Sequence, residues 1–161
     1  MLSVPFYYAL LVLCWIYALR RGGAPERIGA TVLVVGSLLT LVAAVSSTTE
    51  YGSIEIGVFL VDVATLVAFL ALALRAERYW TLWIAALQLI GTAGHAVKLV
   101  DPNVIPRAYA FVTVFWSYPM LLLIALGTYR HQQRLKMFGV DRSWSNFSAP
   151  WARGRKTGPT V

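Results

Sequence analysis

Five apolar segments, each close to the length needed to cross a lipid bilayer, dominate this sequence. A helix needs about 20 residues to span a hydrocarbon core, and runs of this length without strict alternation are not strands. Short polar connections separate the segments. The sequence therefore predicts an all-α, polytopic membrane bundle with five transmembrane helices, at Leu2–Leu19, Ile28–Ser46, Ile56–Leu74, Trp80–Val100 and Ala108–Tyr129.

The composition favours a lipid environment over water. Hydrophobic residues make up 58% of the chain and charged residues only 13%, whereas soluble domains carry roughly 25% charged residues. In a bilayer the excess apolar surface faces lipid. The length of 161 residues suits one bundle, predicted over residues 1–130, followed by a tail over 131–161. Cys14 is the only cysteine, so an internal disulfide is excluded.

The basic residues predict how the spans are oriented, because Lys and Arg stay on the cytoplasmic side of a membrane. Of the 14 Lys and Arg residues, all but Lys98 and Arg107 follow the first, third or fifth segment. This pattern predicts an N-out, C-in topology with a cytoplasmic C-terminus. The small size and compactness favour the bacterial inner (cytoplasmic) membrane. Trp80, at the start of the fourth segment, is expected in the aromatic belt at the inner interface.

Small residues form a stripe along the second segment, at Gly29, Gly36 and Ala43. Helix association in lipid relies on close packing, and small side chains allow it. The stripe therefore predicts that another helix approaches the second segment closely.

The tail is basic and contains spaced aromatic residues, and it predicts contact with anionic lipid headgroups. Its first part is expected to continue the fifth helix until Gly139. A solvated tail that only fixes topology is the alternative. The net charge of +7 does not indicate nucleic-acid binding, because no folded nucleic-acid module accompanies it. The residues expected at the membrane surface are Trp144, Trp151, Arg153, Arg155 and Lys156.

Ionisable side chains inside spans are costly and mark the one candidate site. Asp62 lies about 9 Å below the outer boundary of the third span, and His95 about 8 Å below that of the fourth, at 1.5 Å per residue. Gln88, Thr92 and His95 share one face of the fourth span, with Lys98 beside them. Because consecutive spans with a short connection are antiparallel neighbours, Asp62 is expected to meet His95.

Several interpretations of this polar layer stay open. It can be an ion pair that locks two helices, with Lys98 reaching the outer headgroups. It can anchor a small amphipathic ligand, or exchange protons or cations. No metal site is predicted, because one His and one Asp supply too few ligands. The sequence does not identify a cofactor.

Motifs for catalysis are absent: the sequence has no nucleophile elbow, HExxH, P-loop or GxGxxG. The first hypothesis is therefore a non-enzymatic binding, sensory or accessory subunit of a membrane complex, with a protein partner or a second copy of itself. The alternative is a small oligomeric transporter or proton- or cation-coupled carrier that uses Asp62 and His95. A membrane enzyme with His95 as its acid–base group has the least support.

Overall fold

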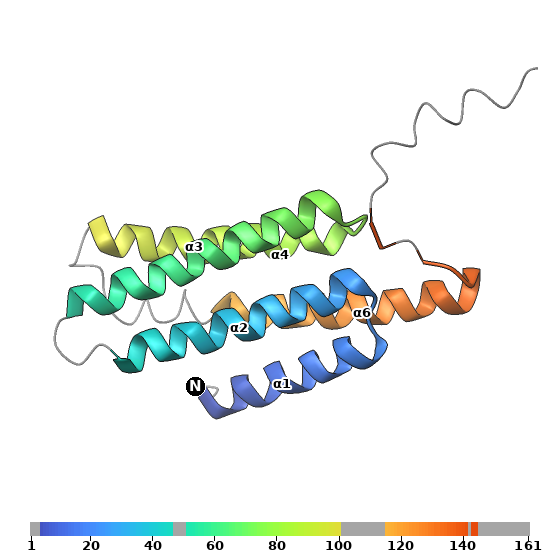
Figure 1. Ribbon diagram of the computed structural model, residues 1–161, viewed down its shortest axis with the longest axis horizontal. Helices are drawn as coiled ribbons and strands as arrows, with labels where there is room; N and C mark the ends of the chain where they lie inside the picture. Colours follow the sequence, from blue (N-terminus) through green and yellow to red (C-terminus); the bar gives the residue numbers. More distant parts are fainter. Residues whose placement is uncertain (1–3, 47–50, 101–114, 142, 145–161) are drawn as a thin grey trace, which may run out of the picture.

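The computed structural model describes residues 4–46, 51–100, 115–141 and 143–144. Within this part the chain is all-α, which confirms the predicted fold class, and its one β contact is an isolated bridge between Ala76 and Trp144. The described residues form five helices (Figure 1): α1 (Val4–Arg21), α2 (Ala24–Ser46), α3 (Tyr51–Arg75), α4 (Tyr79–Val100) and α6 (Ser117–Phe138).

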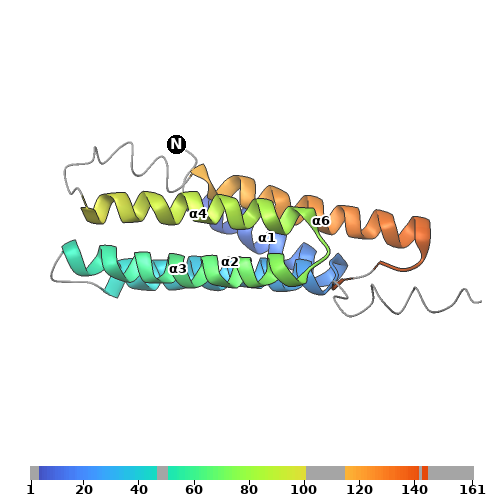
Figure 2. The same ribbon diagram turned by 90° about the horizontal axis from the view of Figure 1, so that it is seen from above.

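The helices run alternately up and down and close into a ring. α1 packs against α2 and α6, α2 against α3, α3 against α4, and α4 against α6, while α2 also reaches α6 across the ring. Figures 1 and 2 show the α1–α2 turn, the α3–α4 turn and the C-terminal end of α6 together at one end of the bundle. We call this end the turn end. It is where the topology prediction placed the cytoplasmic side.

The helix ends follow from their turn residues. α2 begins at Ala24 with Pro25 in its first turn, where a missing N–H costs no hydrogen bond. α6 likewise carries Pro119 in its first turn. α6 ends at Gly139, which has φ 70° and donates its N–H to the Leu135 carbonyl at 3.0 Å. This left-handed cap favours glycine, and it confirms that the fifth helix continues into the tail as far as Gly139.

The small-residue stripe of α2 is confirmed as a packing surface. A Cβ at Gly36 would lie 2.8 Å from Oγ1 of Thr65 on α3, and a Cβ at Gly57 would lie 3.5 Å from that of Ala43. A Cβ at Gly29 would lie 2.9 Å from the ring of Trp80. The backbone of α2 therefore approaches its neighbours too closely for larger side chains.

Trp80, in the first turn of α4, lies in the core and not on the outer surface of the bundle. Its ring sits between Gly29 of α2 and Gly127 of α6, where a Cβ would lie 2.8 Å from its Nε1. The residue is only 9% exposed. Its neighbours in the core include Phe69 and Ile124, which are fully buried. Two glycines on different helices thus make a slot for one large aromatic ring.

The five predicted spans are confirmed only in part. Among the described residues, two stretches are long and apolar enough to cross a membrane, Ala24–Ala43 of α2 and Ile56–Arg75 of α3. Only 28% and 17% of these stretches is buried, whereas a core helix of a soluble protein is mostly buried. Within the described residues, α4 carries the polar side chains of Gln88 and His95, and α6 begins at Ser117 and ends in basic sequence. Residues 108–114, the first part of the expected fifth span, lie outside the described residues.

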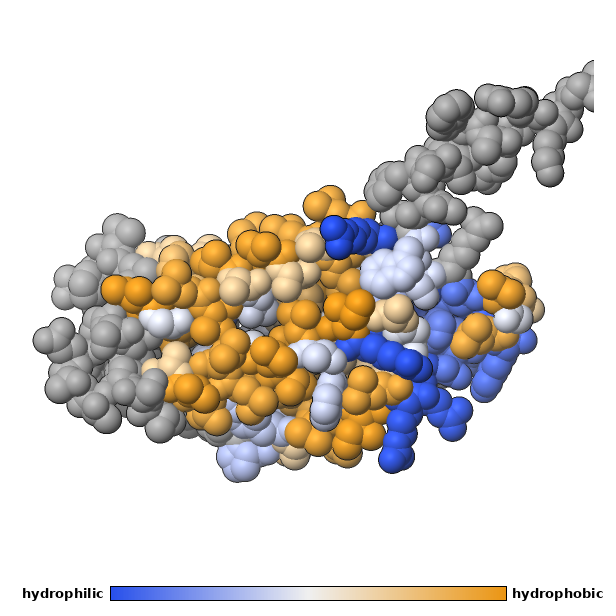
Figure 3. Space-filling view, in the orientation of Figure 1, coloured by the Kyte–Doolittle hydropathy of each residue, from blue (hydrophilic) through white to orange (hydrophobic). Residues whose placement is uncertain are grey.

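Apolar side chains cover the outside of the helices, and hydrophilic ones gather at the turn end (Figure 3). Large hydrophobic residues are exposed on every helix, among them Leu13, Leu39, Leu60, Leu89 and Leu122. Contiguous apolar surface of this kind is rare on soluble monomers and marks contact with a membrane or a partner.

The Trp80 slot generates a test of packing. Gly127→Ala is expected to destabilise the bundle by about 1–3 kcal/mol, because the added methyl group overpacks the slot. Gly91→Ala is the matched control on α4, where an added Cβ meets nothing within 4 Å; helix propensity alone should then stabilise by about 0.5–1 kcal/mol. Thermal unfolding in detergent, followed by circular dichroism, measures both. Equal shifts for the two variants would contradict the packing described above.

Candidate functional site

Asp62 of α3 and His95 of α4 are in direct contact, as the depth argument predicted. His95 Nε2 lies 2.9 Å from Asp62 Oδ2. Gln88 Nε2 donates to Asp62 Oδ1 at 3.3 Å and lies 3.4 Å from the Asp62 carbonyl oxygen. The carboxylate is therefore held by two side chains of α4. The side chains of Asp62 and His95 remain 18% and 12% exposed, so the pair is not sealed from its surroundings.

The other predicted members of this site have separate roles or lie outside the description. Thr92 is buried, and its hydroxyl donates to the Gln88 carbonyl at 2.9 Å, so it supports its own helix. Lys98 lies in α4, but its side chain is not among those described. Trp144 is 42% exposed beside the α3–α4 turn. The predicted surface contacts Trp151, Arg153, Arg155 and Lys156 lie outside the described residues.

A second group of polar side chains lies in the same half of the bundle, between α1, α2 and α6. The hydroxyl groups of Tyr7 and Ser37 are 3.2 Å apart, and the Tyr8 hydroxyl donates to the Ser37 carbonyl at 3.3 Å. The rings of Tyr7 and Tyr118 meet edge to face, with centroids 5.6 Å apart. The Tyr118 hydroxyl and Trp116 Nε1 are buried without a hydrogen-bond partner. Both are donors, so this half of the interior has capacity for a further acceptor.

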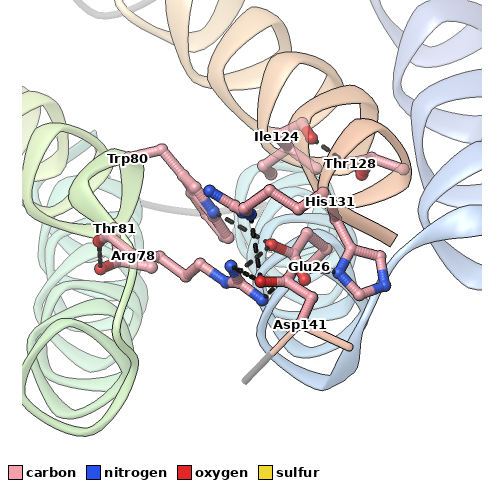
Figure 4. Close-up of polar contacts among 9 residues, drawn as sticks. Glu26, Arg78, Trp80, Thr81, Ile124, Thr128, His131 and Asp141 are labelled. Atoms are coloured by element: carbon pink, nitrogen blue, oxygen red, sulfur yellow. Dashed lines mark hydrogen bonds and ion pairs between the residues drawn. The ribbon is translucent and has the colours of Figure 1, made fainter. Parts of the chain in front are cut away.

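The turn end holds a larger charged cluster that sequence reasoning missed (Figure 4). Asp141, which follows α6, accepts two hydrogen bonds from Arg78 of the α3–α4 turn, at 2.8 and 2.7 Å. His131 Nδ1 lies 2.6 Å from the same carboxylate. Arg134 Nε lies 3.1 Å from it, in ion-pair and not hydrogen-bond geometry. The two hydrogen bonds from Arg78 to Asp141 form a bidentate contact, which is the strong form of an arginine–carboxylate pair.

Glu26 of α2 extends the cluster into the core. It is completely buried, and its Oε1 accepts from Trp80 Nε1 at 3.3 Å and lies 3.4 Å from Arg78 Nε. Its Oε2 is buried without a hydrogen bond. A Cβ at Gly23 would lie 2.9 Å from that oxygen and 2.9 Å from Cε1 of His131. Arg78 therefore faces two carboxylates from different parts of the chain.

The cluster fixes the segment after α6 against the rest of the turn end. The bridge between Ala76 and Trp144 continues the contact that Arg78 makes with Asp141. Nearby, Gln132 donates to the Arg21 carbonyl, which joins α6 to the α1–α2 turn. After the predicted boundary at residue 130, His131, Asp141 and Trp144 thus contact other elements of the turn end.

Electrostatics favour the ionised form of Asp141. Burial raises the pKa of this carboxyl, but hydrogen bonds from Arg78 and His131 and the charges of Arg78 and Arg134 lower it by more. The net effect is a pKa lowered from 3.8 to about 2. Because the folded pKa is below the unfolded value, the stabilisation is fully present above about pH 4 and is lost as the pH falls towards 2.

The sequence did contain a signal for this cluster. Three predicted helices have ends that meet at the turn end, and these ends are flanked by Glu26, Arg78 and His131. Acidic residues are few at the turn end. By sequence, Arg78 counts only among the basic residues after the third segment, which indicate topology.

Neither cluster is arranged to hold a metal. In the part of the chain that the structure describes, no three side chains of His, Cys, Asp or Glu converge on a common point. The chain matches no protein-family model, no curated protein and no solved structure. The geometry and the sequence therefore carry the functional argument.

Asp141→Asn tests the charged cluster. It should destabilise the protein by about 3–5 kcal/mol at pH 7, because it leaves Arg78 buried beside fewer negative charges. Glu77→Gln is the matched control, an exposed carboxylate in the same turn, with an expected effect within about 0.5 kcal/mol. Chemical unfolding between pH 7 and pH 2 measures both. The difference between wild type and Asp141→Asn should hold above about pH 4 and shrink below it; a pH-independent difference would contradict the assigned role.

Proposed function

We propose that the chain is an integral membrane protein with five spans, N-out and C-in, in a bacterial inner membrane. We infer that it acts as a non-enzymatic binding, sensory or accessory subunit through the Asp62–His95 pair. The observation that carries this proposal is the 2.9 Å contact between a carboxylate and an imidazole that both remain partly exposed. Such a pair holds α3 against α4 and can also exchange one partner for a polar group of a ligand or a neighbouring helix.

Two features support the membrane assignment. Exposed apolar side chains on all five helices would be costly in water and are suited to lipid. Apart from Lys98 of α4, the basic residues in the described part of the chain gather at the turn end, as expected for a cytoplasmic side: Arg20, Arg21, Arg27, Arg75, Arg78, Arg130, Arg134 and Lys136. The tail residues that carry the predicted headgroup contacts follow directly from this end.

The direct test is gentle purification from native membranes, with mass spectrometry of co-purifying proteins and small molecules. Asp62→Asn and His95→Gln should each lower the yield of a specific partner or ligand. Thr92→Val is the matched control on the same face of α4, because the Thr92 hydroxyl bonds only its own helix. A partner set that is identical in wild type and both site variants would overturn the proposal.

A purely structural role of the pair makes a different prediction. Hydrogen bonds between membrane helices contribute about 0.6 kcal/mol on average and at most about 1.7 kcal/mol. A double-mutant cycle on Asp62 and His95, measured by unfolding in detergent, should give a coupling energy in this range. If Asp62→Asn or His95→Gln loses the partner while its melting temperature is unchanged, the pair acts in binding and not only in helix packing.

The same contact favours one second candidate, a small carrier coupled to protons or cations. The imidazole is charged only when protonated, so gain or loss of one proton converts the contact between an ion pair and a neutral hydrogen bond. In this case, protein in liposomes should support ion flux that Asp62→Asn abolishes and Thr92→Val preserves. Flux that is absent in wild type, or equal in Asp62→Asn, would exclude the carrier.

A further inference from the structure

A narrow apolar groove runs between α2 and α3 on the outer surface of the bundle. Its volume is about 440 Å³. Gly36 and Thr65 form its floor, because the two helices approach most closely there. Its walls are mostly aliphatic: Ile28, Val32, Val35, Leu39, Val61, Ala64 and Ala68.

The polar residues at one end of the groove come from the first turns of α2. Arg27 lines this end and is exposed. Its Nε donates to the Gly22 carbonyl at 3.0 Å, and a guanidinium has further N–H donors in the same plane. Thr31 donates to the Arg27 carbonyl at 2.8 Å and accepts from Trp15 Nε1 at 3.1 Å. An indole at this level is typical of a membrane interface.

The length of the groove suits an acyl chain. From Arg27 to Leu39, α2 rises about 18 Å at 1.5 Å per residue, which is close to half of a hydrocarbon core of about 30 Å. The groove is open to the outside and its walls are mostly aliphatic, so a single acyl chain can lie along it with its headgroup at the Arg27 end.

The charge at the end of the groove selects the headgroup. Arg27 contacts the α1–α2 turn through the Gly22 carbonyl, and the exposed Arg20 and Arg21 directly precede this glycine. The nearest acid in sequence, Glu26, is completely buried and faces Arg78 and Trp80. The surface at this end is therefore positive, which favours an anionic group at the membrane interface.

We propose that the groove binds one anionic phospholipid of the cytoplasmic leaflet, with an acyl chain along α2 and α3 and the phosphate on Arg27. The site rests on the proposed membrane topology but not on Asp62 or His95. It lies on the outer face of α2 and α3, so it adds a specific lipid to the headgroup contacts expected of the tail.

The test uses the full chain in phosphatidylcholine nanodiscs. Trace amounts of phosphatidylglycerol or phosphatidylcholine, spin-labelled on the same acyl carbon, report the fraction of lipid immobilised by the protein. Wild type should immobilise phosphatidylglycerol preferentially. Arg27→Gln should reduce this preference about fivefold, the effect of one basic residue near an anionic surface, whereas Arg130→Gln, an exposed arginine on α6, should retain it.

A second pair of variants tests the groove itself. Ala64→Leu fills the groove from an exposed position on α3 and should abolish the preferential immobilisation. Ala86→Leu adds the same side chain at an exposed position of α4 outside the groove and should leave it unchanged. Equal immobilisation of both lipids by wild type, or identical behaviour of the two leucine variants, would overturn the lipid site. A chain that fails to insert would overturn the membrane assignment as well, so the two failures are distinguishable.

Discussion

The buried charge of Arg78 is the constraint on which the turn end depends. Its side chain is 3% exposed, and the carboxylates of Glu26 and Asp141 that face it are 0% and 7% exposed. A buried cation without a partner costs several kcal/mol. The three groups come from α2, the α3–α4 turn and the segment after α6, so pairing them fixes three pieces of chain at once. In the proposed membrane setting, helix packing lacks a hydrophobic driving force between helices, which gives such polar contacts a larger share in setting the arrangement.

The two ends of the bundle use polar groups in different ways. At the turn end the paired charges of Glu26, Arg78 and Asp141 are buried. Trp80 packs in its glycine slot beside them. In the opposite half, Asp62 and His95 join α3 to α4 and stay partly exposed. A contact between two helices can be broken without unpairing the rest of the bundle, whereas a change at Arg78 disturbs several elements. The exposed pair is therefore the better place for binding, and the enclosed cluster the better place for stability.

The sequence predicted the contacts made by consecutive helices and missed those that close the ring. Asp62 and His95 could be paired because a short connection makes α3 and α4 antiparallel neighbours, and a fixed rise per residue then sets their levels. The stripe of Gly29 and Gly36 likewise indicated close packing. Asp141 contacts both His131 and Arg78. To predict this, two further facts are needed: α6 lies beside α2 and α4, and the chain turns back after Gly139. Neither follows from hydrophobic periodicity.

The first turn of α2 shows how one short stretch serves both the core and the surface. Glu26 points inward, where Arg78 and Trp80 take up its Oε1, and its neighbour Arg27 lies exposed at the end of the groove. Because the carboxylate of Glu26 is paired inside the bundle, it does not neutralise the exposed charge of Arg27. Two to three turns further along, Gly36 allows α3 to approach α2 closely. The groove beside this approach begins at the positive charge of Arg27. The packing that stabilises the bundle and the surface suited to a lipid thus arise from the same helix.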